Sequence, residues 1–561
     1  MDDPLLEVHD LAVRYGAVLA VNHASFNLSR NRVLGIVGES GSGKSTLIWA
    51  LTRLLPEVAT VSSGSAWFEG KDLLRMPQEE LQALRGTRIS YISQDPMSAL
   101  TPALTIGQQM VDVLYREPWS EKEKYSRALD ALEWVSLPDP AARMKMYPYE
   151  LSGGQRQRVS IAMALMLEPD LVIADEPTTA LDATLEIEIL DLLRRLQKET
   201  ESAVIFVTHH LGVVSSLCDD VLVMNHGDVV EAGPVSEVFS QPKHAYTRKL
   251  LRCDPARIEQ ATRRLPTMTD DLSAPIDIFS GPTDRVKSQD APVLDVAGLS
   301  VTFHKPGVLP TWLGGRAQEI RAVRDVSLCV HHGETLALVG ESGSGKTTIA
   351  RSVLGLVDTA EGDITVNGQE VDRADSAGLK TIRACTSMMF QDPVGSLSPR
   401  VTIGEQIFEP LIVQGQTSVD REATVSGLLT DVGLPASFAT RYPHELSGGQ
   451  ARRVGVARAL ALSPKLIIAD EPTAGLDVSV QGEVLNLLNE IQERTGVSIL
   501  IITHNMSVVR HSADRVVVLL KGEIVETGAC AQVFEAPARD YTRALIAASQ
   551  HKLPEMSEVE A

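Results

Sequence analysis

The phosphate-binding loop pattern G-x-x-x-x-G-K-[S/T] occurs twice in this chain, as GESGSGKST from Gly38 and as GESGSGKTT from Gly340. Each copy follows an apolar run of strand length and precedes a stretch that can form a helix, which is the context that this pattern requires. The glycines let backbone N–H groups surround a phosphate, and the start of the helix adds partial positive charge. The sequence therefore predicts two phosphate-binding sites in one chain.

The two loops belong to an internal repeat. An Asp-Glu pair, a Thr-His pair and a Tyr-Thr-Arg motif recur at a constant offset of 295 residues, which pairs Asp175 with Asp470, His209 with His504 and Tyr246 with Tyr541. A constant offset predicts the same fold twice. The second copy has 14 additional residues ahead of its loop, within HKPGVLPTWLGGRAQEIRAV. We expect this stretch to form a loop because it is rich in glycine and proline.

The repeat divides the chain into four parts. We predict a first domain over residues 1–252, a linker over 253–292, a second domain over 293–548 and an acidic tail over 549–561. The linker mixes proline with charged and small polar residues and shows little apolar periodicity, with a short helix expected around Arg257–Arg263. We expect it to act as a tether between the domains.

Within each domain, short apolar runs of buried-strand length alternate with helical stretches. The runs VLGIVG, LVIADE and AVIFVTHH in the first copy have counterparts such as LIIADE and SILIITHN in the second, and functional residues follow each run. Ligands of α/β sheets bind at the carboxyl ends of parallel strands. We therefore predict an α/β fold with a mostly parallel sheet in each domain.

The charge and the cysteines of the chain disfavour several kinds of protein. Lys plus Arg is 52 and Asp plus Glu is 73, so the net charge of −21 disfavours nucleic acid as a partner. The five cysteines are scattered without a C-x-x-C pair, which fits a reducing cytosol. The first residues lack the features of a signal peptide, and no apolar run approaches the ~18 residues of a spanning helix. We expect a chain that does not itself cross a membrane.

The residues of each loop have separate expected roles. Lys44 and Lys346 are expected to reach the β- and γ-phosphates of ATP, and Ser45 and Thr347 to bind Mg²⁺. The other loop residues that we predict to bind ATP are Gly38, Ser40, Gly41, Gly43 and Thr46 in the first copy, and Gly340, Ser342, Gly343, Gly345 and Thr348 in the second.

Adjacent carboxylates follow an apolar strand in both LVIADEPT and LIIADEPT. The first of each pair, Asp175 or Asp470, can hold Mg²⁺ directly or through water. The second, Glu176 or Glu471, can orient and deprotonate an attacking water. A lone Asp-Glu pair is commonly just a solvated strand end, but a phosphate-binding loop in the same domain favours the catalytic interpretation.

The segments LSGGQRQRV (Leu151–Val159) and LSGGQARRV (Leu446–Val454) resemble the signature sequence of ABC-type ATPases. The order of loop, glutamine, signature, Asp-Glu pair and histidine is also that of this family, and the resemblance covers nearly all of both domains. It implies two tandem P-loop NTPase domains, each with a RecA-like core, an antiparallel β subdomain and a helical signature subdomain. The signature residues precede a helix and offer a hydroxyl and N–H groups at its positive end: Ser152, Gly153 and Gly154, and Ser447, Gly448 and Gly449.

The family resemblance also implies roles for residues outside the loops. In this family the signature binds the γ-phosphate of the nucleotide held by the opposite domain, which implies two composite ATP sites. Further residues with implied roles are Gln94 and Gln391 at Mg²⁺ and the attacking water, His209 and His504 at the γ-phosphate, and Asp182 and Asp477 in the D-loops. Tyr15 and Phe303 resemble the aromatic residue that stacks on adenine, although a strand aromatic is often part of the core and His304 could compete in the second domain.

Finer features resemble the paired ATPases of dipeptide, oligopeptide and nickel importers, here fused into one chain. YPYELSGGQRQRVSIAMAL resembles the first ATPase of the pair and RYPHELSGGQARRVGVARAL the second. Two departures are the single Cys253 where many relatives have a cysteine-rich segment, which leaves an iron–sulfur centre unsupported, and Ala451 at the place of Arg156. A soluble tandem ATPase acting on ribosomes or nucleic acid, and the ATPase of an exporter, are the alternatives.

The importer resemblance implies partners and a location. It implies ATP and Mg²⁺ as cofactors, two transmembrane permease subunits, and through them an extracytoplasmic solute-binding protein. The chain would then lie peripherally on the cytoplasmic face of the bacterial inner membrane. We expect the permeases to dock just after the glutamines, in a partly apolar groove with Met97–Leu104 and Val394–Val401 near its floor. The transported solute cannot be read from this chain, because such importers select it with other subunits.

Overall fold

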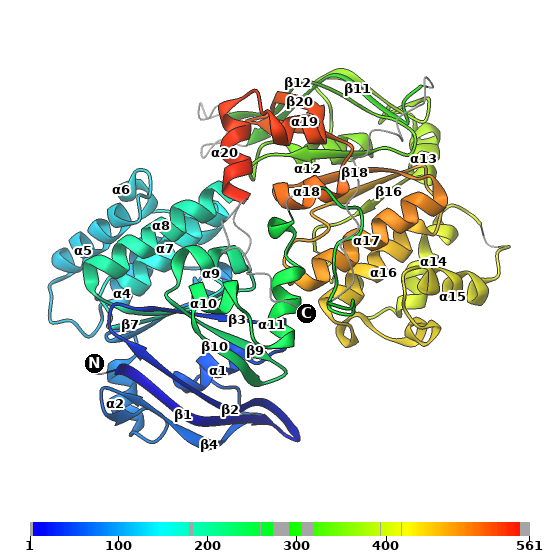
Figure 1. Cartoon of the computed structure of the whole chain (residues 1–561). Coiled ribbons are helices and arrows are strands. Elements are labelled where there is room, and N and C mark those ends of the chain that lie inside the picture. The colour runs from blue at the N-terminus through cyan, green and yellow to red at the C-terminus, as the bar shows by residue number, and fades with distance from the viewer. Residues whose placement is uncertain are drawn as a thin grey trace. The chain divides into compact units, whose positions relative to one another are not determined.

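The computed structural model describes residues 4–178, 183–258, 260–272, 291–305, 318–392, 394–416 and 418–549. Contacts within the chain divide it into two compact units with the boundary between Arg257 and Ile258, and Figure 1 shows that each unit combines sheet and helices. None of the helices in the described part of the chain combines the length and apolarity that a membrane crossing needs.

The first unit is built on a ten-stranded sheet in the order β5-β4-β1-β2-β10-β9-β3-β8-β7-β6. Strands β9, β3, β8, β7 and β6 are parallel neighbours, whereas β1 pairs with β2 and β4 in antiparallel fashion. The strands are β1 Pro4–Tyr15, β2 Val18–Ser29, β3 Val33–Val37, β4 Ala59–Phe68, β5 Lys71–Asp72, β6 Ile89–Ile92, β7 Leu171–Asp175, β8 Ala203–Val207, β9 Asp220–Asn225 and β10 Asp228–Pro234.

The helices of the first unit include one group that lies apart from the antiparallel strands. In Figure 1 the helices α4 to α8 gather on one side of the unit, away from β1, β2 and β4. The helices are α1 Lys44–Leu51, α2 Gln78–Leu84, α3 Pro96–Ala99, α4 Ile106–Val113, α5 Glu121–Trp134, α6 Pro140–Arg143, α7 Gly153–Leu165, α8 Ala183–Thr200, α9 Leu211–Leu217, α10 Val235–Ser240 and α11 Ala245–Arg252, with short 3₁₀ turns at Pro148–Glu150 and Pro255–Arg257.

The second unit repeats this plan with two sheets. One is antiparallel with the order β12-β11-β14-β15, and the other has the order β16-β17-β18-β13-β19-β20 and is parallel from β16 to β19. The strands are β11 Leu294–Lys305, β12 Gln318–Val330, β13 Thr335–Val339, β14 Glu361–Val366, β15 Gln369–Glu370, β16 Thr386–Met389, β17 Leu466–Asp470, β18 Ser498–Thr503, β19 Arg515–Leu520 and β20 Glu523–Ala529.

The helices of the second unit follow the same order as those of the first. They are α12 Lys346–Val353, α13 Ser376–Cys385, α14 Ile403–Val413, α15 Arg421–Asp431, α16 Gly448–Leu460, α17 Val478–Thr495, α18 Met506–Ser512, α19 Cys530–Glu535 and α20 Asp540–Ser549, with 3₁₀ turns at Ala436–Thr440 and Pro443–Glu445. The predicted fold class, two tandem α/β P-loop domains with antiparallel and helical subdomains, is confirmed.

The cores explain why the central strands are unbroken apolar runs. Every residue of β3, β7 and β8 is buried, because a parallel sheet covered on both faces has no solvated side. Leu34 and Ile36 of β3 face the apolar cluster that contains Leu47 and Ile48 of α1, whereas Val33 faces the cluster of the helical subdomain. The same strand thus supports the phosphate loop and fixes the two layers that flank it.

Two local predictions need correction. The loop expected over HKPGVLPTWLGGRAQEIRAV is too long, because His304 and Lys305 belong to β11 and its last six residues belong to β12; residues 306–317 lie outside the described residues. The helix expected around Arg257–Arg263 is also wrong for the residues that are described there. A 3₁₀ turn ends at Arg257, and the chain then continues without helix.

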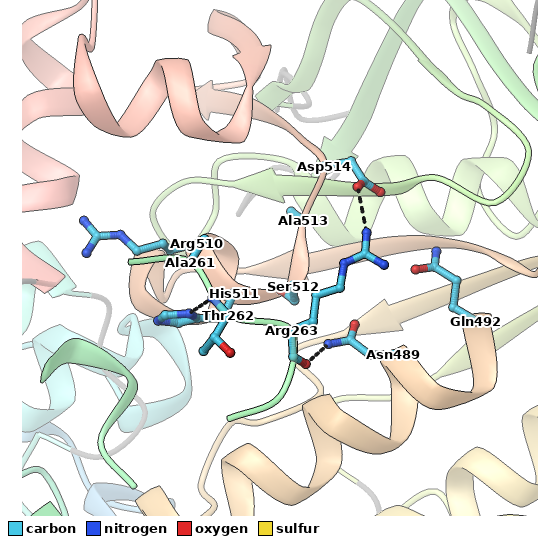
Figure 2. Close-up of a pocket in the computed structure, with 10 residues that line it drawn as sticks. All are labelled: Ala261, Thr262, Arg263, Asn489, Gln492, Arg510, His511, Ser512, Ala513 and Asp514. Carbon is cyan, nitrogen blue, oxygen red and sulfur yellow. Dashed lines mark hydrogen bonds and ion pairs between the residues drawn. The ribbon is translucent and has the colours of Figure 1, made fainter. Parts of the chain in front are cut away.

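Part of the predicted linker is docked on the second unit. We call residues 260–270 the docked segment. Its Leu265 is 1% exposed and packs with Leu485 of α17 and Val508 of α18. Figure 2 shows Arg263 reaching toward Asp514, at 3.8 Å, while Asn489 donates a hydrogen bond to the Arg263 carbonyl. The domain limits at residues 252 and 293 stay predictions, but these contacts place the segment with the second unit.

Candidate nucleotide-binding sites

Each phosphate loop connects a buried strand to the helix that follows it. In the first unit the loop runs from the end of β3 to α1, and Gly43 precedes the helix with a φ of 102°. A Cβ on Gly38 would lie 2.2 Å from the carbonyl oxygen of Met224, and one on Gly43 would lie 2.3 Å from that of Ala20. No larger residue fits at these places, so the glycines let the loop lie directly on the sheet.

The loop lysines are buried and hold the loop itself. The Lys44 ammonium donates to the carbonyl oxygens of Gly38 and Glu39, at 2.7 and 2.9 Å. Lys346 makes the same pair of bonds at 2.7 and 2.8 Å, to Gly340 and Glu341. The ammonium group of each lysine is therefore held by two carbonyl oxygens of its own loop. A phosphate would compete for this ammonium group, because a charged oxygen is a stronger acceptor than a carbonyl.

The loop hydroxyls lie next to the aspartates at the ends of β7 and β17. Ser45 donates to Asp175 at 3.5 Å, and Thr347 donates to Asp470 at 3.1 Å. Both aspartates are nearly fully buried. Burial raises the pKa of the Asp175 carboxyl, and the neighbouring Glu176 raises it further, against the hydrogen bond from Tyr91.

This donor set fits a magnesium ion. A hydroxyl and a buried carboxylate offer oxygen atoms only, and the negative charge of each aspartate stands beside a second carboxylate. Magnesium typically takes one or two carboxylates together with the phosphates of its nucleotide. Within the described residues no cluster of three or more His, Cys, Asp and Glu forms a separate metal site.

The glutamates after β7 and β17 contact the predicted histidines. The His209 Nδ1 atom lies 3.2 Å from a carboxylate oxygen of Glu176, and the His504 Nδ1 atom lies 2.8 Å from one of Glu471. Both glutamates have a left-handed backbone, with φ of 46° and 50°. This conformation is rare for a residue with a Cβ, and it is characteristic of functional sites where the surroundings hold it in place.

The two predicted glutamines differ in their contacts. Gln94 donates its side-chain amide to Glu176 at 2.8 Å, whereas the exposed Gln391 accepts a hydrogen bond at its backbone carbonyl from Arg452. In the second unit Thr503 donates to Glu471 at 3.3 Å. The glutamate after the strand is thus held by a glutamine and a histidine in the first unit, and by a threonine and a histidine in the second.

The signature residues form the N-terminus of a long helix in both units. Ser152 caps α7 and Ser447 caps α16, and each hydroxyl accepts the N–H of the glutamine three residues on. These helices begin at Gly153 and Gly448, so the two glycines of each signature belong to the first helical turn, whereas the sequence predicted that they precede the helix. A Cβ on Gly154 would lie 2.0 Å from Leu185, so this glycine permits close packing of α7 on α8. Both capping serines are exposed and accessible to a ligand.

The weaker sequence assignments differ in their surroundings. Tyr15 ends β1 and is partly buried, whereas Phe303 on β11 is 42% exposed and lies beside the exposed His304. Phe303 is therefore not a core residue. Asp477 directly precedes α17, and Asp182 lies outside the described residues.

Two residues at the sites were missed by sequence reasoning. Tyr91 on β6 donates to Asp175 at 2.8 Å and accepts from the Trp49 indole at 3.0 Å. Arg452 on α16 is 2% exposed and donates to the carbonyl oxygens of Gln391, Glu471 and Ala474. The repeat offset places Gln157 at the position of Arg452. This difference between the two copies is the one signal in the sequence that could have drawn attention to Arg452.

Comparisons with known proteins identify the family of this chain. The family model described as "ABC transporter" matches residues 21–179 and 323–474, and the model "Oligopeptide/dipeptide transporter, C-terminal region" matches residues 230–281. The glutathione import ATP-binding protein GsiA of Pectobacterium atrosepticum is 41% identical over 541 residues, which cover 94% of this chain and 86% of that protein.

One further relative matches nearly the whole chain, and a solved structure matches less than half of it. The peptidoglycan transport ATP-binding protein YejF of Agrobacterium fabrum is 40% identical over 557 residues, which cover 97% of this chain and 96% of that protein. Among solved structures, cbiO1 from Clostridium perfringens, part of an ABC transporter complex, is 32% identical over 43% of this chain and 92% of its own, with a TM-score of 0.39.

Proposed function

Because this chain belongs to the ABC transporter family as an ATP-binding and ATP-hydrolysing subunit with two cassettes, we propose that its two units share two composite ATP sites and power the import of small peptide-like solutes. The observation that supports this most is that both copies keep the contact between catalytic glutamate and histidine, Glu176 with His209 and Glu471 with His504. Both sites are therefore expected to hydrolyse ATP.

The residues of one unit would bind the phosphates and the Mg²⁺ ion of each site. When ATP binds, the ammonium of Lys44 or Lys346 moves from the loop carbonyls to the phosphates, where its charge is better matched. Ser45 with Asp175, or Thr347 with Asp470, would hold Mg²⁺, which neutralises phosphate charge as the γ-phosphate is transferred. Gln94 and Gln391 would lie next to this ion.

Hydrolysis also needs a general base next to the γ-phosphate, to accept the proton of the attacking water. Glu176 or Glu471 orients a water and takes its proton as the water oxygen bonds to the γ-phosphorus and the bond to the β–γ bridging oxygen breaks. Products are ADP and inorganic phosphate. The histidine that contacts each glutamate fixes its carboxylate, and its imidazole would contact the γ-phosphate.

The signature of the opposite unit completes each site in this proposal. Ser447 and Gly449 would join the site of Lys44, and Ser152 and Gly154 would join that of Lys346. Support comes from the exposed serine hydroxyls at the start of α7 and α16, where the helix end carries partial positive charge. ATP then acts as the ligand that holds the two cassettes together.

The solute class follows from the relatives. GsiA is a glutathione import protein and YejF a peptidoglycan transport protein, and residues 230–281 of this chain match the oligopeptide/dipeptide transporter model. Both solutes contain short peptides. We therefore assign small peptide-like solutes, moved inward, to the importer that this chain powers.

The experiment is reconstitution of this chain with candidate permeases and a candidate solute-binding protein from the same genome. ATP hydrolysis is measured in vesicles with glutathione, with a muropeptide, or with a free amino acid as the control. Stimulation by one of the peptide-like solutes, with ATP-dependent movement of label toward the side that carries this chain, is the expected result. Stimulation by neither solute, or movement in the opposite direction, would refute the assignment.

We further assign two permeases to the complex, one for each unit, on the cytoplasmic face of the inner membrane. Met97 on α3 is 38% exposed and Val394 is 44% exposed, and both follow shortly after the glutamines. Leu100 and Leu397 in the same segments are buried in the core, so the apolar contact surface would start from Met97 and Val394.

This docking assignment has a direct test. Met97→Glu with Val394→Glu should abolish recruitment to vesicles that contain the permeases, while binding of ATP in solution is retained. Val58→Glu is the matched control, because Val58 is 72% exposed and lies outside the helical subdomain. Recruitment that survives the double substitution would contradict the assignment.

A further inference from the structure

The Tyr-Thr-Arg motif recurs in both copies, as AYTRKL and DYTRAL, yet the hydrolysis scheme gives it no role. The structure places each tyrosine against a phosphate loop. The backbone N–H of Glu39 donates to the Tyr246 hydroxyl at 3.1 Å, and that of Glu341 donates to the Tyr541 hydroxyl at 3.2 Å. The same contact thus forms twice, between partners 207 and 200 residues apart.

A carboxylate fixes the turn that precedes each tyrosine. Glu231 on β10 accepts the backbone N–H groups of Lys243 and His244, at 2.8 and 3.1 Å. Glu526 on β20 accepts those of Ala538 and Arg539, at 2.7 and 3.2 Å. Because β10 and β20 belong to the sheets that carry the loops, the start of α11 and of α20 is tied to the same framework as the loop.

The other two residues of the motif complete this arrangement. Arg248 donates to the carbonyl oxygen of Lys243 at 3.0 Å, and Arg543 donates to that of Pro537 at 2.7 Å, so each arginine folds back on the same turn. The threonines, Thr247 and Thr542, are 1% and 0% exposed. The motif therefore packs its helix onto the unit and fixes the direction of its tyrosine.

The tyrosine bond complements the lysine bond on the loop. Lys44 holds the carbonyl oxygen of Glu39 and Tyr246 holds its N–H, so two side chains fix the same residue from opposite ends of its backbone. In the second unit Lys346 and Tyr541 hold Glu341 in the same way. When the lysine turns to the phosphates, the tyrosine hydroxyl still accepts the backbone N–H of this residue.

We propose that Tyr246 and Tyr541 are positioning residues that keep the first turn of each phosphate loop in the shape that binds ATP. The loop is then already ordered before the nucleotide arrives, so the free energy of ATP binding does not include the entropy lost by ordering it. Affinity for ATP increases, and the chemical step is unchanged. In the second unit the same helix also contacts α18, since Ser507 donates to the carbonyl oxygen of Ser549 at 3.1 Å. Helix α20 thus joins the loop to the helix that begins just after His504.

The test removes one hydroxyl at a time. In a Glu471→Gln background, which leaves the first site as the one that turns over, Tyr246→Phe should raise the KM for ATP about fivefold, equivalent to about 1 kcal/mol, with kcat changed less than twofold. Tyr541→Phe in a Glu176→Gln background should do the same at the second site. Titration with ADP, which needs no hydrolysis, should give a similar loss of affinity.

Thermal stability distinguishes this positioning role from a purely structural one, in which stability would fall and the KM for ATP would not change. Phenylalanine keeps the ring, so the melting temperature should fall by no more than about 4 °C, the shift expected from the loss of about 1 kcal/mol in a unit of this size. Tyr125→Phe is the control, because Tyr125 is an exposed tyrosine on α5, and its KM should be that of the parent. An unchanged KM in either tyrosine variant, or a fall in stability without a change in KM, would overturn the proposal.

Discussion

The hydrogen bonds that hold the docked segment predict how much a single substitution should weaken its docking. Asn486 on α17 is 8% exposed and forms two hydrogen bonds with the backbone of Leu265, accepting its N–H and donating to its carbonyl oxygen, both at 2.8 Å. Asn486→Ala removes both bonds and leaves a buried N–H and C=O without their partners. At about 1 kcal/mol for each bond, docking should weaken by about 2 kcal/mol.

Such a change is local, so hydrogen exchange is the suitable measurement. A loss of ~2 kcal/mol corresponds to ~30-fold faster exchange of the peptide that covers residues 260–270. Asn489→Ala is the graded control, since Asn489 gives a single bond to Arg263 at 2.8 Å, and it should accelerate exchange by about fivefold. Exchange in the central strands should stay at the parent rate in both variants.

The reasoning fails if the two variants do not rank in this order. Equal acceleration by Asn486→Ala and Asn489→Ala would mean that the paired bonds to Leu265 do not hold the segment. Unprotected exchange over residues 260–270 in the parent protein would mean that the whole linker is a tether, as the composition alone predicted.

Three further outcomes follow from the sites. Glu176→Gln and Glu471→Gln should each slow hydrolysis at their own site by ~10²–10⁴-fold, measured as phosphate release in a single turnover; a parent rate at either site would mean that the sites are not equivalent. Arg452→Gln gives the second unit the residue of the first, and the loss of bonds to three carbonyl oxygens should slow the second site about tenfold in a Glu176→Gln background, whereas an unchanged rate would make that arginine dispensable. Burial raises the pKa of the Asp175 carboxyl, so the stability that this group confers is present at low pH and is lost as the pH rises through its folded-state pKa. Asp175→Asn should therefore raise the melting temperature without nucleotide at pH 7, with a smaller gain near pH 4, while it abolishes Mg²⁺-dependent hydrolysis; a lower melting temperature at pH 7 would contradict this.

Local sequence patterns predicted the parts of the fold that are locally determined. The run LIIADE matches β17, which is buried at every residue, because only a strand covered on both faces has so many consecutive apolar residues. The glycines of GESGSGKST predicted a loop that lies on the sheet, and the close approach at Gly38 gives the reason. Roles assigned to single side chains remain predictions until they are measured.

Contacts between distant residues could not be predicted in the same way. Tyr91 reaches Asp175 because β6 and β7 are parallel neighbours, and nothing in YISQ indicates a partner 84 residues away. At Arg452 the sequence does hold a signal, because its counterpart in the first copy, Gln157, is uncharged. The three carbonyl acceptors of Arg452 depend on the tertiary fold and could not be predicted from that difference.

The docked segment illustrates a different limit. Its stretch of the chain is polar and rich in proline, which is typical of a tether. Yet its Leu265 packs against α17 and α18, and its Arg263 pairs with Glu493 of α17. A few anchoring residues do not produce the periodicity on which sequence reasoning depends.

The central claim is that each ATP site combines the loop of one unit with the signature of the other. The most direct measurement is single-turnover hydrolysis at the first site, in a Glu471→Gln background, with a bulky arginine placed at each signature serine in turn. We predict that Ser447→Arg abolishes hydrolysis by the site of Lys44 and that Ser152→Arg leaves ATP bound and hydrolysed there. If Ser152→Arg abolishes that turnover and Ser447→Arg preserves it, each unit works with its own signature and the composite sites are refuted.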